Sequence, residues 1–83
     1  MLKLKIATPR GIAYNKEARS ITLRTTEGEI TILPNHIPLV SELVPCRLKI
    51  REGQEETSIN ISGGVLEVRK GSEVVVLSES VVE

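Results

Sequence analysis

The sequence predicts an all-β fold, and both its residue content and its periodicity carry that prediction. Val, Ile and Thr supply 24 of the 83 residues, against three Ala. β-Branched side chains lose rotamer freedom in a helix and pack well on a pleated sheet. Apolar residues also alternate with polar ones over short runs, and turn signals separate these runs about every 8–12 residues. This pattern is typical of a β-sandwich or a barrel.

The amino-terminal half contains one clear strand and three shorter ones. Leu2, Leu4 and Ile6 alternate with lysines, as expected for a strand with one buried face. Pro9 and Gly11 interrupt this run, and only a weak extension follows them. The shorter strands are expected at residues 11–14, 20–24 and 29–33, the last after a turn at Glu27–Gly28.

The carboxyl-terminal half predicts five strands and one distinct hairpin. Apolar residues alternate with cations along residues 46–51, and the alternation returns along residues 57–61 after a short loop. Gly63–Gly64 predicts a break or a bulge, because paired glycines favour backbone angles that other residues avoid. The run from Val74 to Leu77 is apolar at every position, so we expect it to be covered on both faces. The other strands are expected at residues 40–44, 65–69 and 73–77.

The composition argues against nucleic-acid binding and against an enzyme. Eleven Lys and Arg balance eleven acidic residues, so the chain has no cationic excess to neutralise phosphates. Tyr14 is the only aromatic residue, which leaves no platform for base stacking. All the acidic residues are Glu, so a Ser-His-Asp triad cannot be built. One His and one Cys cannot assemble a closed zinc site or an intrachain disulfide, and no cofactor is expected.

The length and the hydropathy pattern restrict the organisation further. A chain of 83 residues is expected to form a single domain. No apolar run approaches the roughly 18 residues that span a bilayer, so direct membrane insertion is not expected. A single cysteine suits a reducing compartment.

Besides a glutamate with a shifted pKa, two residues are candidates for chemistry, and each has a second interpretation. His36 lies between two prolines, with no acidic residue within five positions, so it is either a solvated loop residue or an interface residue. Cys46 occupies an apolar position in a strand, so it is either a core thiol or a nucleophile.

Two further features are candidates for binding. Arg47, Lys49 and Arg51 share one face of a predicted strand, which is either solvated or in contact with an acidic partner. The segment from Pro34 to Pro38 is stiff, because each proline fixes its own φ and restrains the residue before it. It is therefore either a docking element or a structural turn.

Two stretches carry a recognisable pattern. Residues 27–39, read as Glu-Gly-Glu-Ile-Thr-Ile-Leu-Pro-Asn-His-Ile-Pro-Leu, resemble a signature of the epsilon subunit of F-type ATP synthases. Ser-Gly-Gly-Val-Leu-Glu-Val at residues 62–68 is similar to the second signature of that family. Residues 74–77 match the apolar strand that follows it, and residues 2–9 match the first strand. The resemblance covers essentially the whole chain.

The resemblance implies a flattened ten-strand β-sandwich over residues 1–83. It also implies a non-catalytic subunit of the central stalk that couples the gamma subunit to the polar loops of the c ring. Such a subunit is peripheral, at the cytoplasmic face of the bacterial plasma membrane. By position in the motifs, Glu29 and His36 approach the ring. The motif residues that shape the backbone are Pro34, Pro38, Gly28, Gly63 and Gly64.

The sequence departs from the family pattern in two places. Family members usually continue into a helical hairpin that restrains ATP hydrolysis and in some members binds ATP. Residues 78–83 lie where that hairpin begins, so we expect the helical domain to be absent and assign neither helix-mediated inhibition nor nucleotide binding. Cys46 stands where a glycine is common. The alternative to a rotor subunit is a free-standing β-sandwich adaptor that binds another protein.

Overall fold

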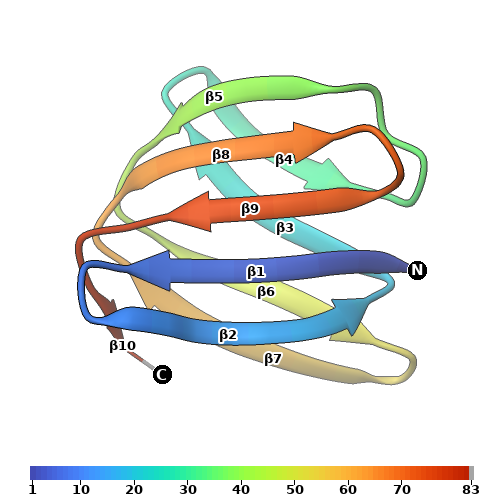
Figure 1. Cartoon of the computed structure of the whole chain (residues 1–83), viewed down its shortest axis with the longest axis horizontal. Helices are drawn as coiled ribbons and strands as arrows, with labels where there is room; N and C mark the ends of the chain where they lie inside the picture. Colours follow the sequence, from blue (N-terminus) through green and yellow to red (C-terminus); the bar gives the residue numbers. More distant parts are fainter. Residues whose placement is uncertain (83) are drawn as a thin grey trace.

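A computed structural model describes residues 1–82, which form ten β-strands and no helix (Figure 1). The molecule measures 26 × 25 × 22 Å. All nine strands expected from the alternation are present, most within one or two residues of the predicted bounds. The ten strands are β1 (Leu2–Thr8), β2 (Gly11–Ala18), β3 (Ser20–Thr25), β4 (Gly28–Ile32), β5 (Leu39–Leu43), β6 (Cys46–Glu52), β7 (Glu55–Ile61), β8 (Gly64–Arg69), β9 (Glu73–Leu77) and β10 (Val81–Val82).

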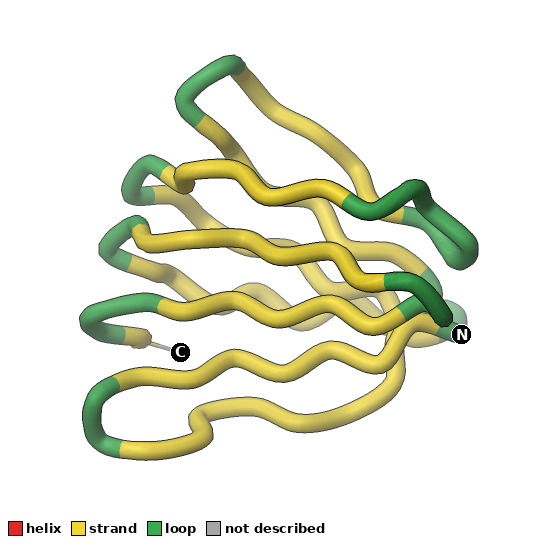
Figure 2. The backbone as a smooth tube through the Cα atoms, turned by 45° about the horizontal axis from the view of Figure 1, so that its top comes forward, coloured by secondary structure: helices red, strands yellow, loops and turns green. Residues whose placement is uncertain are grey.

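The strands form one sheet that folds over on itself into two layers (Figures 1 and 2). Its order is β10-β7-β6-β3-β5-β8-β9-β1-β2, and β4 pairs with β3 beside this path. The first layer holds β5, β8, β9, β1 and β2, and the second holds β4, β3, β6, β7 and β10. Only Thr25 and Leu43 pair where β3 meets β5, so the link between the layers is narrow. The fold is therefore the expected all-β, ten-strand sandwich.

The core lies between the two layers and follows from the period-two pattern of the strands. Along β1, Leu2, Leu4 and Ile6 are fully buried, whereas the lysines between them are exposed. The same alternation places Leu48 and Ile50 of β6 on the opposite wall of the core. Each such side chain contributes about 1.5–3 kcal/mol when it leaves water. The remaining buried hydrophobic residues are Ala18, Ile21, Leu23, Ile32, Leu43, Ile59, Ile61, Leu66, Val68, Val74 and Val76.

Two strands differ from the prediction. β2 extends to Ala18, because it pairs with β1 along its whole length even though most of its side chains are exposed. Only Tyr14 and Ala18 of β2 are withdrawn from solvent, so the strand carried little hydrophobic signal. β10 is a two-residue strand in which Val81 pairs with Ile61, and two residues are too few for a period to be recognised. Glu83, the last residue of the 78–83 segment, lies outside the described residues.

The expectation that β9 is covered on both faces is wrong. Val74 and Val76 are fully buried in the core, but Val75 is only half-buried and Leu77 is 52% exposed. No element of the described chain packs over the outer side of β9, because the second layer covers only its inner side (Figure 1). The apolar residues on the outer face of β9 therefore remain accessible to solvent.

The paired glycines form the expected break, because they separate β7 from β8. They also allow the start of β8 to approach the end of β9 closely. Gly63 and Gly64 have φ angles of +109° and +135°, where side chains with a Cβ are strained. A Cβ atom at Gly64 would lie 1.8 Å from the carbonyl oxygen of Leu77. Because that oxygen belongs to the backbone, no side-chain rotation can relieve the clash. The contact requires glycine at this position.

Tyr14 joins the two layers at the edge of the sandwich. Its hydroxyl group on β2 donates a hydrogen bond to the carboxylate of Glu52 on β6. Partial burial, this hydrogen bond and the negative charge of Glu52 all raise the pKa of Tyr14 above its usual value. The neutral phenol is therefore the form that the folded state favours.

We expect Gly64→Ala to lower the free energy of unfolding by about 3 kcal/mol or more, through backbone strain and overpacking together. Gly53→Ala is the matched control, because Gly53 has φ +65° and a Cβ there meets nothing within 4 Å. That control is expected to cost about 1 kcal/mol, from strain alone. Urea unfolding of both variants makes the comparison, and equal losses would show that the Leu77 contact is unimportant.

We expect Tyr14→Phe to lower the free energy of unfolding by about 1 kcal/mol near neutral pH, because Glu52 loses its donor. The pKa of Tyr14 is higher in the folded state than in the unfolded state, where it is about 10. The resulting stabilisation is therefore complete below about pH 10 and is lost as the pH rises through the pKa of the folded state. The parent chain should therefore lose stability above about pH 10 more steeply than the Phe variant. If the free energy of unfolding fell equally with pH for both proteins above pH 10, the raised pKa of Tyr14 would not contribute to stability.

Candidate protein-interaction surfaces

The loop between β4 and β5 is a tight turn with a fixed shape. The backbone N–H of His36 donates a hydrogen bond to the carbonyl oxygen of Leu33, at 3.2 Å. Pro34 occupies the second position of this turn, and Asn35 occupies the third with φ +65°. Proline followed by a residue of positive φ is the arrangement of a type II turn, in which Asn is tolerated. The sequence therefore determines this turn locally.

A second set of contacts ties the loop to the rest of the sandwich. The N–H of Asn35 donates to the hydroxyl of Ser72 in the β8–β9 turn, at 2.9 Å. The carbonyl oxygen of Ser72 in turn accepts the N–H of Lys3 on β1, at 2.9 Å. The His36 ring is half-buried, and its Nδ1 lies 2.7 Å from the carbonyl oxygen of Ile37. The loop is thus held to the β8–β9 turn and, through Ser72, to β1. It is therefore ordered before any partner binds.

The same end of the molecule presents large apolar side chains. Ile37 is 75% exposed, and Leu33 and Met1 are more than half exposed. Met1, Leu33 and Pro34 line a shallow depression of about 420 Å³ together with Arg19 and Arg51. We call the surface formed by Met1, Leu33 and Ile37 the loop end.

The structure does not bring Glu29 and His36 together. Glu29 is the second residue of β4 and pairs with Arg24 of β3, whereas His36 follows the other end of β4. The strand between them is about 10 Å long, at roughly 3.3 Å per residue. Glu29 lies instead in a depression lined by Arg24, Arg47 and Lys49.

Gly28 is the first residue of β4 and has a φ angle of +124°. Its carbonyl oxygen accepts a hydrogen bond from the Thr25 hydroxyl.

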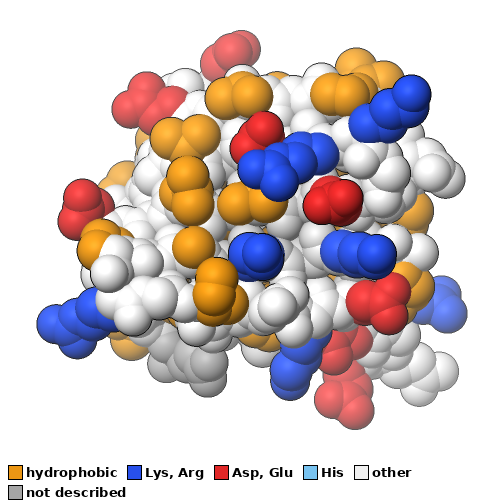
Figure 3. All heavy atoms as spheres, in the orientation of Figure 1, with side chains coloured by type: hydrophobic (Ala, Val, Ile, Leu, Met, Phe, Trp, Pro, Cys, Tyr) orange, Lys and Arg blue, Asp and Glu red, His pale blue; other side chains and the backbone are white. Residues whose placement is uncertain are grey.

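An apolar surface that sequence reasoning did not single out runs across the outer face of the first layer. Val65, Leu77, Ala7 and Ile12 are successive cross-strand partners in β8, β9, β1 and β2. Val65, Leu77 and Ile12 are 41%, 52% and 57% exposed. Figure 3 shows hydrophobic side chains gathered in a band across this layer. We call these four residues the apolar stripe. The sequence signal that could have identified it is an apolar residue at an outward-facing position in each of these four strands.

A shallow pocket of about 380 Å³ continues the apolar stripe at one end. Ala7 and Leu77 belong to both features, and Pro9 and Ser78 complete much of the pocket wall. Gly64 also lines the pocket, so the close approach of β8 to Leu77 shapes it. The stripe and the pocket form one continuous surface that is mainly apolar, with Glu79 as the charged residue of the pocket lining.

The residues that were candidates for chemistry are scattered over the molecule. Cys46 is half-buried at the start of β6, packed against the margin of the core, and His36 lies in the loop between β4 and β5. The thiol of Cys46 lies 4.0 Å from the carbonyl oxygen of Arg24, a weak contact. Within residues 1–82, no group of three His, Cys or Glu side chains could hold a metal ion. The described chain also contains no helix that is long and apolar enough to cross a membrane.

Comparison with known proteins assigns a family to this arrangement. The family model described as "ATP synthase, Delta/Epsilon chain, beta-sandwich domain" matches residues 1–83. The chain is 40% identical over 78 residues to the ATP synthase epsilon chain of Thermotoga petrophila. It is 37% identical over 79 residues to that of Alkalihalophilus pseudofirmus. These matches cover 94% and 95% of this chain but 71% and 59% of the two relatives.

Solved structures show the same fold. A chain of the Euglena gracilis mitochondrial ATP synthase, in a cryo-EM structure of OSCP/F1/c-ring, superimposes with a TM-score of 0.92 and 26% identity. The match covers 98% of this chain and 52% of that one. A chain from the central stalk/c-ring of the Tetrahymena thermophila enzyme has a TM-score of 0.84 and 19% identity over 99% of this chain and 66% of its own. At 19% identity, the second match shows only that the two chains share a fold.

Proposed function

Because the chain belongs to the delta/epsilon family of ATP synthase subunits through its β-sandwich domain, we propose that it couples the gamma subunit to the c ring. It is a non-catalytic component of the central stalk of an F-type ATP synthase. In this role it transmits rotation during ATP synthesis, at the cytoplasmic face of a bacterial plasma membrane.

The observation that carries the proposal is the presence of two separate apolar surfaces on one rigid sandwich. The apolar stripe lies on the outer face of the first layer, and the loop end lies where β4 finishes and β5 begins. A coupling part needs one surface for each of the two parts that it joins. A single docking surface would be sufficient for a free-standing adaptor.

The apolar stripe is the surface that best suits the gamma subunit. Its members stand on four neighbouring strands, so their spacing is set by backbone hydrogen bonds and does not change when a partner binds. Stable interfaces have a core of well-packed apolar residues that is depleted in charge. Burial of the stripe against gamma also adds to the small core that an 83-residue domain can form.

The loop end and Glu29 suit the c ring. The type II turn and the Ser72 anchor hold His36 and Ile37 in place, so little conformational entropy is lost on contact. Glu29 and His36 lie at opposite ends of β4 and therefore provide two contact points, not one. A ring of identical copies repeats the same polar loop, so each point is able to meet a different copy.

We expect Leu77→Gln to weaken binding to the gamma subunit by about tenfold or more, because Leu77 lies at the centre of the apolar stripe. Ile37→Gln is the matched control: it replaces an aliphatic residue at the loop end that is 75% exposed, against 52% for Leu77, and should leave gamma binding unchanged. Co-purification and titration with the cognate gamma subunit provide the measurement. If both variants bind gamma like the parent chain, the stripe is not the gamma surface. A parent chain that folds but does not bind gamma would favour the adaptor.

Single exchanges of Glu29→Ala and His36→Ala should each reduce proton-coupled ATP synthesis in the reconstituted complex while gamma binding is retained. Both side chains lie outside the core, so their loss removes a contact and not stability. Because the two positions are separated by β4, their effects are expected to add. Unchanged synthesis in the double variant would show that neither residue contacts the ring.

A further inference from the structure

We propose that the outer face of β3 and β6 carries a third docking site, which binds an extended acidic segment of a partner protein. The site is the depression of about 370 Å³ around Arg24, Arg47 and Lys49, which we call the basic depression. It lies on the second layer of the sandwich, away from the apolar stripe. The proposal does not depend on how gamma binds to that stripe.

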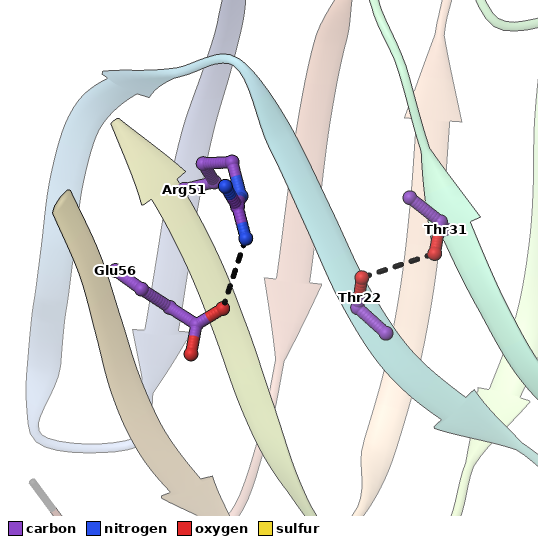
Figure 4. Close-up of polar contacts among 4 residues, drawn as sticks. All are labelled: Thr22, Thr31, Arg51 and Glu56. Carbon is purple, nitrogen blue, oxygen red and sulfur yellow. Dashed lines mark hydrogen bonds and ion pairs between the residues drawn. The ribbon is translucent and has the colours of Figure 1, made fainter. Parts of the chain in front are cut away.

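These three cations have no ion-pair partner among residues 1–82. The ion pairs of the described chain are Arg51–Glu56, at 3.7 Å, and Arg69–Glu67, at 3.1 Å. Figure 4 shows Glu56 of β7 reaching across to Arg51 of β6. The basic face expected from the sequence is thus divided: Arg51 has a partner, whereas Arg47 and Lys49 do not.

The fold adds a cation from a distant part of the chain to this site. Lys49 stands beside β3, because β6 pairs with that strand at Thr22. Arg24 follows two positions later on β3 and lines the same depression as Arg47. Glu29 is the only acidic residue in its lining, which leaves a formal local charge of +2, from three cations and one carboxylate, in a chain of zero net charge.

The shape of the site and the spacing of its cations also suit an extended acidic segment. Pro45 and Cys46 contribute an uncharged wall, so a bound carboxylate is partly shielded from water. Arg47 and Lys49 are two residues apart on one strand, which places them about 7 Å apart along it. An extended segment with an acidic residue at every second position has the same repeat. Arginine also binds carboxylates through two parallel hydrogen bonds.

The test is a titration of the full 83-residue chain with a six-residue peptide of alternating Glu and Ser, followed by NMR. The backbone signals of β3 and β6 around the basic depression should shift, and added salt should weaken binding because the site is exposed. Arg47→Gln with Lys49→Gln should weaken binding by about fivefold or more, and Lys49→Gln alone by less. Glu29→Gln should strengthen binding, because it removes the only negative charge of the site.

The matched control is Lys3→Gln with Lys5→Gln, which removes the same charge from exposed positions on the first layer. This control should bind the peptide like the parent chain. Equal weakening by both double variants, or equal binding of a Gln–Ser peptide, would overturn the proposal. It is also overturned if inorganic phosphate or vesicles of anionic lipid bind the depression as tightly as the peptide, or if no signals shift. Thermal unfolding checks that every variant is folded.

Discussion

Burial of alternate strand residues between two sheet layers is the interaction on which the rest of this structure depends. The core contains sixteen hydrophobic residues, all aliphatic and none more than 4% exposed. At about 25 cal/mol for each Å² of apolar surface removed from water, this burial is the main term that opposes chain entropy. The described ion pairs add little to this term, because they lie on the surface.

Since the core uses one face of each strand, the other face is free to carry different chemistry on each layer. The first layer carries the apolar stripe, and the second carries cations around Glu29. The Gly64 contact links core and surface, because it brings β8 against Leu77, and Leu77 belongs to both the stripe and its pocket. A small sandwich is thereby able to offer distinct surfaces without any change in its core.

The strands that sequence reasoning placed well are those with a strong hydrophobic alternation, such as β1 and the β6–β7 hairpin. The errors have two causes: strand pairing overrides a weak local signal, and an apolar run does not show whether another element covers its second face. β2 is a strand along eight residues because β1 offers a partner, although its own side chains are mostly exposed. β9 looked buried on both faces because it is apolar throughout, yet nothing in the described chain lies over Leu77.

The sequence by itself determined the period of the strands, the stiffness of the segment from Pro34 to Pro38, and the break at Gly63–Gly64. These are local properties, because they depend on the backbone angles and side chains of neighbouring residues. Only the tertiary structure decided that Glu29 lies apart from His36, that Arg24 joins the cations of β6, and that Leu77 aligns with Ala7. Cross-strand register between distant segments is set by how the whole sheet closes over its core, and a local pattern cannot specify it.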